Sequence, residues 1–394
     1  MDVRGRMLKE TLDAKVTEAE GGERRLNHYV IKRVLGSGSF GIVHLALDTD
    51  SNTLVAIKEF SKTKLRKQQA MKNGGIYGAF RGRGRGRGRG AAPGAAAANG
   101  GHAALAAAKS DNPIDLVRGE IAILKKLNHN NVVKLFEVLD DPNQDSLFMV
   151  FELCEKGALM DISLERSAQP LPTDLSRQYF QEILLGIEYL HEHDIAHRDI
   201  KPDNMLISKD GTLKIVDFGV SEIFTREIGT VNKSAGSPAF YAPEMCVARH
   251  GDLSAKLLDI WAIGVTLYCM SFGRLPFNGR SMLDLYESIR SQEPQYPPGI
   301  DPRLKDLLEK LLAKNPDDRI TMDQLRVHPW VTDNGRLPMV SKEQNCESLV
   351  TEITQSDVDA AVVQVRSLFT VLKAVSKLKN LGRAPGSSGD LFPA

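Results

Sequence analysis

The sequence predicts an α+β fold in which a strand-rich N-terminal lobe and a helix-rich C-terminal lobe face each other across a cleft. Short β-branched and apolar runs, separated by glycine-rich or polar turns, dominate the chain up to about residue 151. From residue 173 onward the apolar residues recur at helical spacing. A charged segment that can carry chemistry, 197–204, follows at the end of the first long helix.

Individual elements follow from the same patterns. We expect a strand before Gly36, and further strands at 42–47, 55–58, 131–138, 146–151 and 213–216. The first long helix is expected to begin behind Thr173 as its N-cap and to bury one broad face, formed by the apolar residues at 175, 179, 180, 183, 184, 187 and 190. Residues 257–272, which include Asp259 and Trp261, and residues 303–313 are expected to form later helices.

Composition is typical of a globular protein that stays in a reducing compartment. The 394 residues are 42% hydrophobic and 26% charged, and the formal net charge of +1 gives no global field for nucleic acid or membrane. Four scattered cysteines form neither a metal motif nor a disulfide framework. No apolar run approaches the length of a membrane span, so we expect a cytoplasmic or nuclear protein without a membrane partner.

A glycine-rich turn predicts a nucleotide site in the N-terminal lobe. Gly36, Gly38 and Gly41 have the spacing shared by several nucleotide-binding loops, but here strands rather than a helix flank them. Such a loop lets backbone amides approach phosphates, and Val43 would cover the adenine. Lys58 on the next strand is expected to hold the α and β phosphates, oriented by Glu120 on a helix that buries residues 121, 124 and 127.

The segment 197–204 offers the groups that phosphoryl transfer needs. Asp199 can accept the proton of a hydroxyl, Lys201 can neutralise the moving phosphate, and Asn204 can ligate Mg²⁺. A second metal ligand, Asp217, is expected at the end of the strand at 213–216. Between the lobes, Gly157 is a candidate hinge residue, and the backbone groups of Glu152 and Cys154 are expected to meet the adenine edge.

Other segments divide the chain. We expect a poorly ordered N-terminal extension at 1–28, a catalytic domain at 29–331 and a regulatory tail at 332–394. The insert at 74–108 contains five Arg-Gly repeats and an Ala/Gly tract, and is expected to be disordered. Its arginines leave open an RNA- or protein-binding role beside that of an inert spacer. Glu244 and Arg319 are expected to form a structural ion pair.

Taken together, these motifs resemble the complete signature set of eukaryotic protein kinases. The text around them, notably Asp140-Asp141-Pro142-Asn143 and Asp217-Phe218-Gly219-Val220-Ser221, is similar to the calcium/calmodulin-dependent protein kinase kinase family over roughly 29–383 apart from the insert. The insert lies where that family carries an Arg/Pro-rich segment for substrate recognition, but it has a single proline, Pro93.

The resemblance implies a bilobal kinase fold, ATP and Mg²⁺ as cofactors, and downstream kinases as substrates. Ser237 would stand beside the substrate hydroxyl, where the family has threonine. Thr225, Thr230 and Ser234 lie in the activation loop, where a phosphate could be received by Arg198. The residues that would contact ATP are Leu35, Gly36, Ser37, Gly38, Ser39, Phe40, Gly41, Val43, Ala56, Lys58, Glu120, Phe151, Glu152, Cys154, Leu206 and Val216.

The tail contains a candidate calmodulin-binding helix at 365–383. One helical face is formed by Val365, Leu368, Phe369, Leu372 and Val375, and Leu378 extends it. The segment has five basic residues and no acidic ones. A terminal helix docked on the catalytic domain would give a similar pattern. The family places its autoinhibitory and calmodulin-binding region here, and the candidate anchors are Leu368, Phe369, Leu372 and Leu381.

Three functions therefore remain open from the sequence. The first is a calcium/calmodulin-activated kinase that phosphorylates activation-loop threonines of other kinases. The second is a constitutive, calmodulin-independent upstream kinase of the AMP-activated kinase. The third is a scaffold that binds RNA or protein through the Arg-Gly insert.

Overall fold

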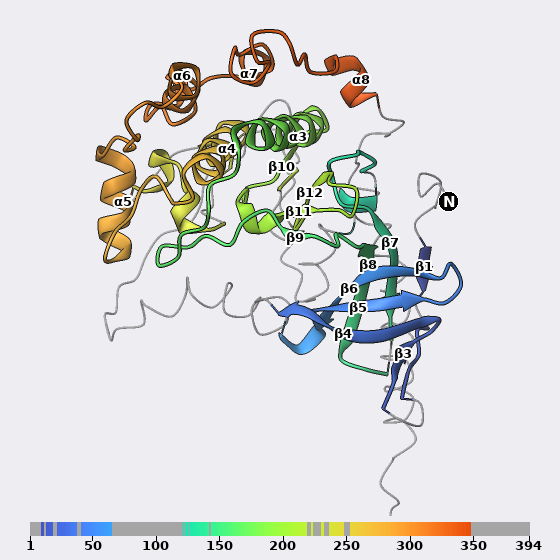
Figure 1. The fold of residues 1–394 in the computed structure, drawn as a ribbon. Helices are drawn as coiled ribbons and strands as arrows, with labels where there is room; N and C mark the ends of the chain where they lie inside the picture. The colour runs from blue at the N-terminus through green and yellow to red at the C-terminus, as the bar shows by residue number, and fades with distance from the viewer. Residues whose placement is uncertain are drawn as a thin grey trace, which may run out of the picture.

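The computed structural model confirms the two-lobed α+β architecture (Figure 1). It describes residues 9–11, 13–18, 22–37, 41–64, 121, 123–125, 127–141, 143–218, 222–223, 230–231, 236–247 and 253–347. The Arg-Gly insert and the tail from residue 348 lie outside the described residues. The same holds for Gly38, Ser39, Phe40, Glu120, Thr225, Ser234, the side chain of Thr230, Leu368, Phe369, Leu372 and Leu381.

The N-terminal lobe is an eight-stranded sheet with the order β1-β7-β8-β6-β5-β4-β3-β2. Its strands are β1 (Lys9–Thr11), β2 (Val16–Glu18), β3 (Arg24–Leu26), β4 (Tyr29–Ser37), β5 (Ile42–Asp48), β6 (Thr53–Ser61), β7 (Leu135–Asp140) and β8 (Ser146–Glu152). β4, β5, β6 and β8 pair antiparallel in succession. This is the strand-loop-strand arrangement expected around the glycine-rich turn. The strand expected at 131–138 begins only at Leu135.

Side chains along β6 alternate between the core of the lobe and the interlobe cavity. Val55 and Ile57 are buried in a core shared with Phe148 and Val150 of β8. Ala56 and Lys58 point to the opposite side and line the interlobe cavity. The period of two along a strand thus delivers Lys58 to the cleft while its neighbours stabilise the lobe.

The N-terminal extension is more ordered than the sequence predicted. Residues 9–26 contribute three strands, of which β1 pairs parallel to β7 and β3 pairs antiparallel to β4. Leu26 and Ala14 are buried in the core of the lobe, and Glu10 forms an ion pair with Lys125 on the helix beside the sheet. The expectation of a poorly ordered lead-in was wrong here because three-residue strands are too short to show a period in sequence.

Polar contacts also fasten this extension to the sheet. Arg24 donates two hydrogen bonds of 2.8 Å to the Glu59 carboxylate on β6. Ser146 and His44 complete the cluster at 2.7 and 2.9 Å from Glu59. Burial alone would raise the pKa of Glu59, but the hydrogen bonds from Arg24 and Ser146 lower it from 4.5 to about 2.

The C-terminal lobe is built on two long helices that lie side by side (Figure 1). The helices are α3 (Thr173–Glu192), α4 (Ala255–Phe272), α5 (Met282–Ser291), α6 (Pro302–Leu311), α7 (Met322–Arg326) and α8 (Lys342–Cys346). Thr173 is not the N-cap of α3: Pro172 occupies that position, and no side chain caps the helix. Proline at this position fixes the backbone angle instead of supplying an oxygen.

Helix α4 corrects the expectation that no apolar run approaches the length of a membrane span. Among the described helices, it alone is long and apolar enough to cross a membrane by length and composition. Its most apolar window is 78% buried inside the fold. The helix is therefore the central core helix of its lobe, where both Asp259 and Trp261 are buried.

Short paired strands follow between residues 157 and 254. They are β9 (Gly157–Ala158), β10 (Ile195–Ala196), β11 (Met205–Ile207), β12 (Leu213–Ile215), β13 (Glu222–Ile223), β14 (Thr230–Val231) and β15 (Leu253–Ser254). β11 pairs with both β9 and β12, β10 pairs with β13, and β14 pairs with β15. In the part of the chain that the structure describes, four 3-10 turns lie at Pro202–Asn204, Pro238–Phe240, Pro243–Met245 and Pro316–Asp318.

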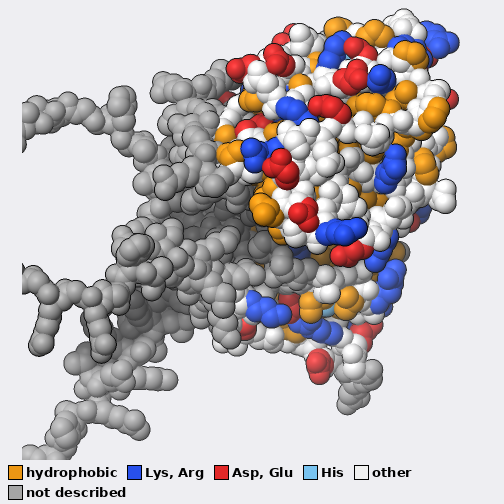
Figure 2. Space-filling model, turned by 90° about the vertical axis from the view of Figure 1, so that its left-hand side faces the viewer, with side chains coloured by type: hydrophobic (Ala, Val, Ile, Leu, Met, Phe, Trp, Pro, Cys, Tyr) orange, Lys and Arg blue, Asp and Glu red, His pale blue; other side chains and the backbone are white. Residues whose placement is uncertain are grey.

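The visible surface matches the balanced charge of the sequence. Figure 2 shows acidic and basic side chains interspersed over the described part of one face, with small apolar areas between them. All four cysteines are free thiols, and Cys154, Cys246 and Cys269 are buried.

The Glu59 cluster predicts a defined pH dependence of stability. Because the folded-state pKa is depressed, the stabilisation is present above pH 4.5 and is lost as the pH falls toward 2. Glu59→Gln should lower the free energy of unfolding by on the order of 2 kcal/mol at pH 7, after allowance for solvent screening. Urea denaturation at pH 7 and pH 3 should show the difference shrinking at the lower pH. Glu287→Gln, at an exposed pair with Arg290, is the control and should change little. A Glu59→Gln effect that is equal at both pH values would contradict the electrostatic explanation.

Candidate active site

A large cavity of about 1230 Å³ opens between the sheet and the helical lobe. Every described residue that the sequence predicted to contact ATP lines it. These are Leu35, Gly36, Ser37, Gly41, Val43, Ala56, Lys58, Phe151, Glu152, Cys154, Leu206 and Val216. Lys201, Asn204, Asp217 and Ser237 line the same cavity, so these four predicted catalytic residues face the predicted nucleotide-binding residues.

Asp199 is the centre of a hydrogen-bond cluster at the edge of this cavity: it lines a small adjoining pocket, and Ser237 lines both. Its carboxylate accepts from the Lys201 ammonium at 2.8 Å, from the Ser237 hydroxyl at 2.8 Å and from the Asn204 amide at 3.0 Å. Lys201 also donates to the Ser237 hydroxyl at 2.7 Å. The cluster fixes the carboxylate and leaves an ammonium beside it, where a hydroxyl and a phosphate would meet.

The same contacts set the charge state of Asp199. Partial burial raises the pKa of a carboxyl, but the hydrogen bond and charge of Lys201, with the Ser237 hydroxyl, bring the pKa of Asp199 below its usual value. Asp199 is therefore ionised throughout the neutral range. An ionised carboxylate can accept a hydrogen bond from a substrate hydroxyl.

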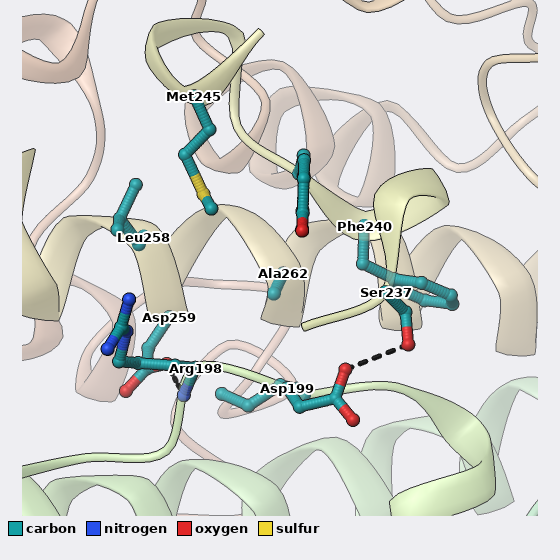
Figure 3. Close-up of a pocket in the computed structure, with 10 residues that line it drawn as sticks. Arg198, Asp199, Ser237, Phe240, Met245, Leu258, Asp259 and Ala262 are labelled. Carbon is teal, nitrogen blue, oxygen red and sulfur yellow. Dashed lines mark hydrogen bonds between the residues drawn. The ribbon is translucent and has the colours of Figure 1, made fainter. Parts of the chain in front are cut away.

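Asp259 on α4 fixes the loop that carries Asp199. Its carboxylate accepts hydrogen bonds from the backbone N–H groups of His197 and Arg198 at 2.9 and 2.8 Å, and lies 2.8 Å from the ring of His191. Figure 3 shows Asp259 reaching from helix α4 to the backbone beside Arg198, and Ser237 pointing at the Asp199 carboxylate. Burial raises the pKa of Asp259, but its hydrogen bonds, led by that from His191, hold it below the ordinary value. These hydrogen bonds stabilise the buried anion, which orients the loop.

The segment before Ser237 needs a residue without a side chain. Gly236 has φ of +101°, and a Cβ there would lie 2.4 Å from the carbonyl oxygen of Arg198. Only glycine allows this close approach, which brings the Ser237 hydroxyl to Asp199. Sequence reasoning did not single out Gly236, although a glycine directly before a predicted site residue is a usable signal.

Lys58 and Asp217 meet across the cleft. The Lys58 ammonium donates to Asp217 at 3.1 Å, which joins β6 of one lobe to the end of β12 in the other. Asp217 has φ of +66°, an uncommon backbone conformation for a residue other than glycine. Phe218 beside it is buried and packs edge-on against His197 at 5.2 Å between ring centres. Packing and strain together aim the Asp217 carboxylate into the cavity.

The donor set fits a divalent cation. Asn204 uses its amide nitrogen for Asp199, at 2.7 Å from the carbonyl oxygen and 3.0 Å from the carboxylate. The amide oxygen is thereby directed away from Asp199, and Asn204 and Asp217 line the same cavity. Carboxylate and amide oxygens are hard ligands of the kind that Mg²⁺ prefers.

The expected hinge also lies in the cavity wall. Glu152 turns its side chain away from the adenine position, because its carboxylate accepts from the Lys134 N–H at 2.8 Å and pairs with Lys214 at 3.1 Å. Gly157 has φ of +76°, as a hinge glycine can. Burial raises the pKa of the Cys154 thiol to about 12, so this cysteine is a wall residue rather than a nucleophile.

The structural ion pair between Glu244 and Arg319 is confirmed. Arg319 donates to both carboxylate oxygens at 2.9 and 3.0 Å, and to the Leu257 carbonyl at 2.7 Å. It therefore ties the segment after Ser237 to the start of α4. Glu120, the expected partner of Lys58, lies outside the described residues, but residues 121 and 124 are buried as the predicted helix face requires.

Comparison with known proteins agrees with this geometry. Residues 102–331 match the family model described as protein kinase domain. The chain is 39% identical over 388 residues to the calcium/calmodulin-dependent protein kinase kinase cmkC of Emericella nidulans, covering 95% of this chain and 72% of the relative. It is 39% identical over 364 residues to the calcium/calmodulin-dependent protein kinase kinase of Caenorhabditis elegans, covering 91% of this chain and 62% of the relative.

A plant relative extends the similarity. Serine/threonine-protein kinase GRIK2 of Arabidopsis thaliana is 35% identical over 332 residues, with 84% of this chain and 72% of the relative covered. Protein kinases use ATP and a divalent cation, for which the cavity offers phosphate-facing and oxygen-donor groups. The chain therefore belongs to the protein kinase family, resembles the calcium/calmodulin-dependent protein kinase kinases over most of its length, and is a protein serine/threonine kinase.

Proposed function

We propose that this kinase phosphorylates activation-loop threonines of downstream protein kinases and is relieved of autoinhibition by calcium/calmodulin. The observation that carries the proposal is the coincidence of a complete catalytic cluster with two relatives whose names state both calmodulin dependence and a kinase substrate. The basic amphipathic segment at 365–383 supports it from the sequence. Because the cysteines are free thiols, we place the activity in the cytoplasm or nucleus.

The chemistry follows from the cluster around Asp199. Its carboxylate would accept the hydrogen bond of the substrate hydroxyl and take its proton as the oxygen attacks the γ-phosphorus of ATP, while the bond from that phosphorus to the β–γ bridging oxygen breaks and ADP leaves. Lys201, 2.8 Å from Asp199, would offset negative charge on the transferred group. Ser237 holds both side chains through one hydroxyl, so base and cation keep a fixed relation.

The N-terminal lobe would hold the nucleotide. Lys58 would bind the α and β phosphates, and the backbone around Gly36 and Gly41 would approach the phosphate chain. Asn204 and Asp217 would hold Mg²⁺, which supplies charge neutralisation to the triphosphate when bound. Lys58 donates to Asp217 at 3.1 Å, so the side chain that would bind the phosphates and the one that would hold Mg²⁺ lie close together.

Calmodulin control would follow from competition for one apolar face of the tail. The face that contains Leu368 and Leu372 cannot contact the catalytic domain and calmodulin at once. Each large anchor moved between apolar sites is worth about 1.5–3 kcal/mol. Reversal of a strongly closed equilibrium needs roughly 5.5 kcal/mol of differential binding, so two or three anchors suffice.

One alternative is favoured by a specific observation. The plant relative at 35% identity is named a serine/threonine-protein kinase with no mention of calmodulin. A constitutive, calmodulin-independent upstream kinase of the AMP-activated kinase would use the same catalytic cluster. The response to calcium separates the two functions.

Asp199→Asn should abolish most phosphotransfer while the protein remains folded. Loss of a general base typically lowers the rate by about 10²–10⁴-fold. Initial rates with ATP, Mg²⁺ and an inactive downstream kinase measure the effect, and circular dichroism checks the fold. Asp210→Asn, in the turn between β11 and β12, is the matched control and should keep full activity. If Asp199→Asn retains the wild-type rate, Asp199 is not the base, and a scaffold function gains support.

Ser237→Ala should lower kcat by about 10–100-fold, because hydrogen bonds to charged partners are worth about 1.5–3 kcal/mol. Ser237→Thr keeps the hydroxyl and should restore most of the rate. Steady-state kinetics of both variants on one peptide substrate provide the test. Equal loss in the two variants would show that space at residue 237, rather than its hydroxyl, matters.

Deletion of 365–394 should raise basal activity and abolish the response to calcium/calmodulin. Kinase assays with calcium/calmodulin or with a calcium chelator measure both effects. In the full chain, the double variant Leu368→Ala/Leu372→Ala should behave like the deletion, whereas Ser367→Ala, on the same segment, should not. If the full chain is equally active with and without calcium/calmodulin, the constitutive alternative holds.

A further inference from the structure

The chain continues to pack on the C-terminal lobe after α7, and one buried side chain dominates that contact. Asn345 of α8 is 9% exposed, whereas Glu343 and Gln344 beside it are exposed. Its amide nitrogen donates to the Leu185 carbonyl at 3.0 Å and to the Glu188 carboxylate at 2.8 Å, both on α3. Its amide oxygen lies 2.9 Å from the Nε2 atom of His129.

His129 belongs to the loop 127–133, which connects the helix beside the sheet to β7. Its Nδ1 atom accepts a hydrogen bond from the Asn131 N–H at 3.0 Å, so the Nε2 atom carries the proton that it donates to Asn345. The ring stacks on Tyr189 at 4.7 Å. Burial lowers the pKa of His129, which agrees with a neutral ring that uses both nitrogens.

From His129 the contacts continue to the catalytic cleft. The Asn131 carbonyl accepts from the Ile215 N–H at 2.9 Å, and the Val133 N–H donates to the Ile215 carbonyl at 3.0 Å. Ile215 ends β12, two residues before Asp217. The next N–H, of Val216, donates to the Asn204 carbonyl at 3.0 Å. The loop 127–133 thus supports the strand that brings Asp217 next to Asn204.

We propose that Asn345 is a positioning residue of the catalytic site: through His129 it fixes the loop 127–133, and through that loop the strand that presents Asp217 to the nucleotide. The segment 341–347 then contributes to the geometry of the catalytic site. The rest of the tail, from residue 348, follows shortly after Asn345, so the position of Asn345 would affect both the tail and the cleft. The inference needs the kinase activity of the chain, but not its control by calcium/calmodulin.

A purely structural role for Asn345 makes a different prediction. An anchor that only stabilises the lobe would change the melting temperature and leave the kinetics of the folded enzyme unchanged. A positioning residue changes the geometry around Asp217, so KM for ATP and the Mg²⁺ concentration for half-maximal activity both rise. The two roles are therefore separated by kinetics measured well below the melting temperature.

The experiment compares Asn345→Ala with Lys342→Ala in the full chain. Lys342 lies on the same helix and pairs with Glu192 at 2.9 Å at the surface, so it is the matched control. With ATP, MgCl₂ and a generic peptide substrate, Asn345→Ala should raise KM for ATP and the Mg²⁺ requirement by about three- to tenfold, the value of about one lost hydrogen bond. Lys342→Ala should stay within about twofold.

A second variant protects the test against loss of folding. His129→Phe keeps the ring that stacks on Tyr189 but removes both hydrogen bonds, and should reproduce the kinetic change. The double variant should be no worse than His129→Phe alone, because the two residues act through one contact. Unchanged KM and Mg²⁺ dependence in both single variants, or strictly additive effects in the double variant, would overturn the proposal.

Discussion

One buried carboxylate holds the catalytic machinery in place. Asp259 projects from the central helix α4 and receives two backbone N–H groups of the loop that leads to Asp199. A charge so deep in a helical core is tolerated because three hydrogen bonds, two from the backbone and one with His191, stabilise it. The loop in turn presents Asp199, Lys201 and Asn204 with little freedom. Rigid placement is what catalysis by positioning requires.

Much of the site was predictable because phosphate chemistry dictates residue type and order. A glycine turn between strands, a lysine on the following strand, and an Asp-x-Lys-x-x-Asn segment before a second aspartate leave few other interpretations. The structure brings the described members together: all but Asp199 line one cavity, and Asp199 is hydrogen-bonded to Lys201 and Asn204 in its wall. Strand alternation then accounts for the direction of Lys58, and helical periodicity for the buried face of α3.

The remainder depends on contacts between distant segments, which local patterns do not encode. The strands at 9–26 are stabilised by partners such as Glu59 and Glu137, far along the chain, and show no period of their own. Pro172 rather than Thr173 precedes α3, because a pattern places a helix end only to within a residue or two. Asn345 looks like any surface asparagine until its three partners on two other segments are seen.

The strands β1 to β3 belong to the shortest segment of this protein that we expect to fold on its own. A boundary drawn at the first recognisable motif, near residue 29, would remove Ala14 and Leu26 from the core of the lobe. It would also strip β7 of its parallel neighbour and leave an open row of backbone donors and acceptors. An unpaired edge strand can pair with a strand of another chain, so a fragment that begins near residue 29 would be prone to self-association. The catalytic lobe therefore starts, in physical terms, well upstream of its signature motifs.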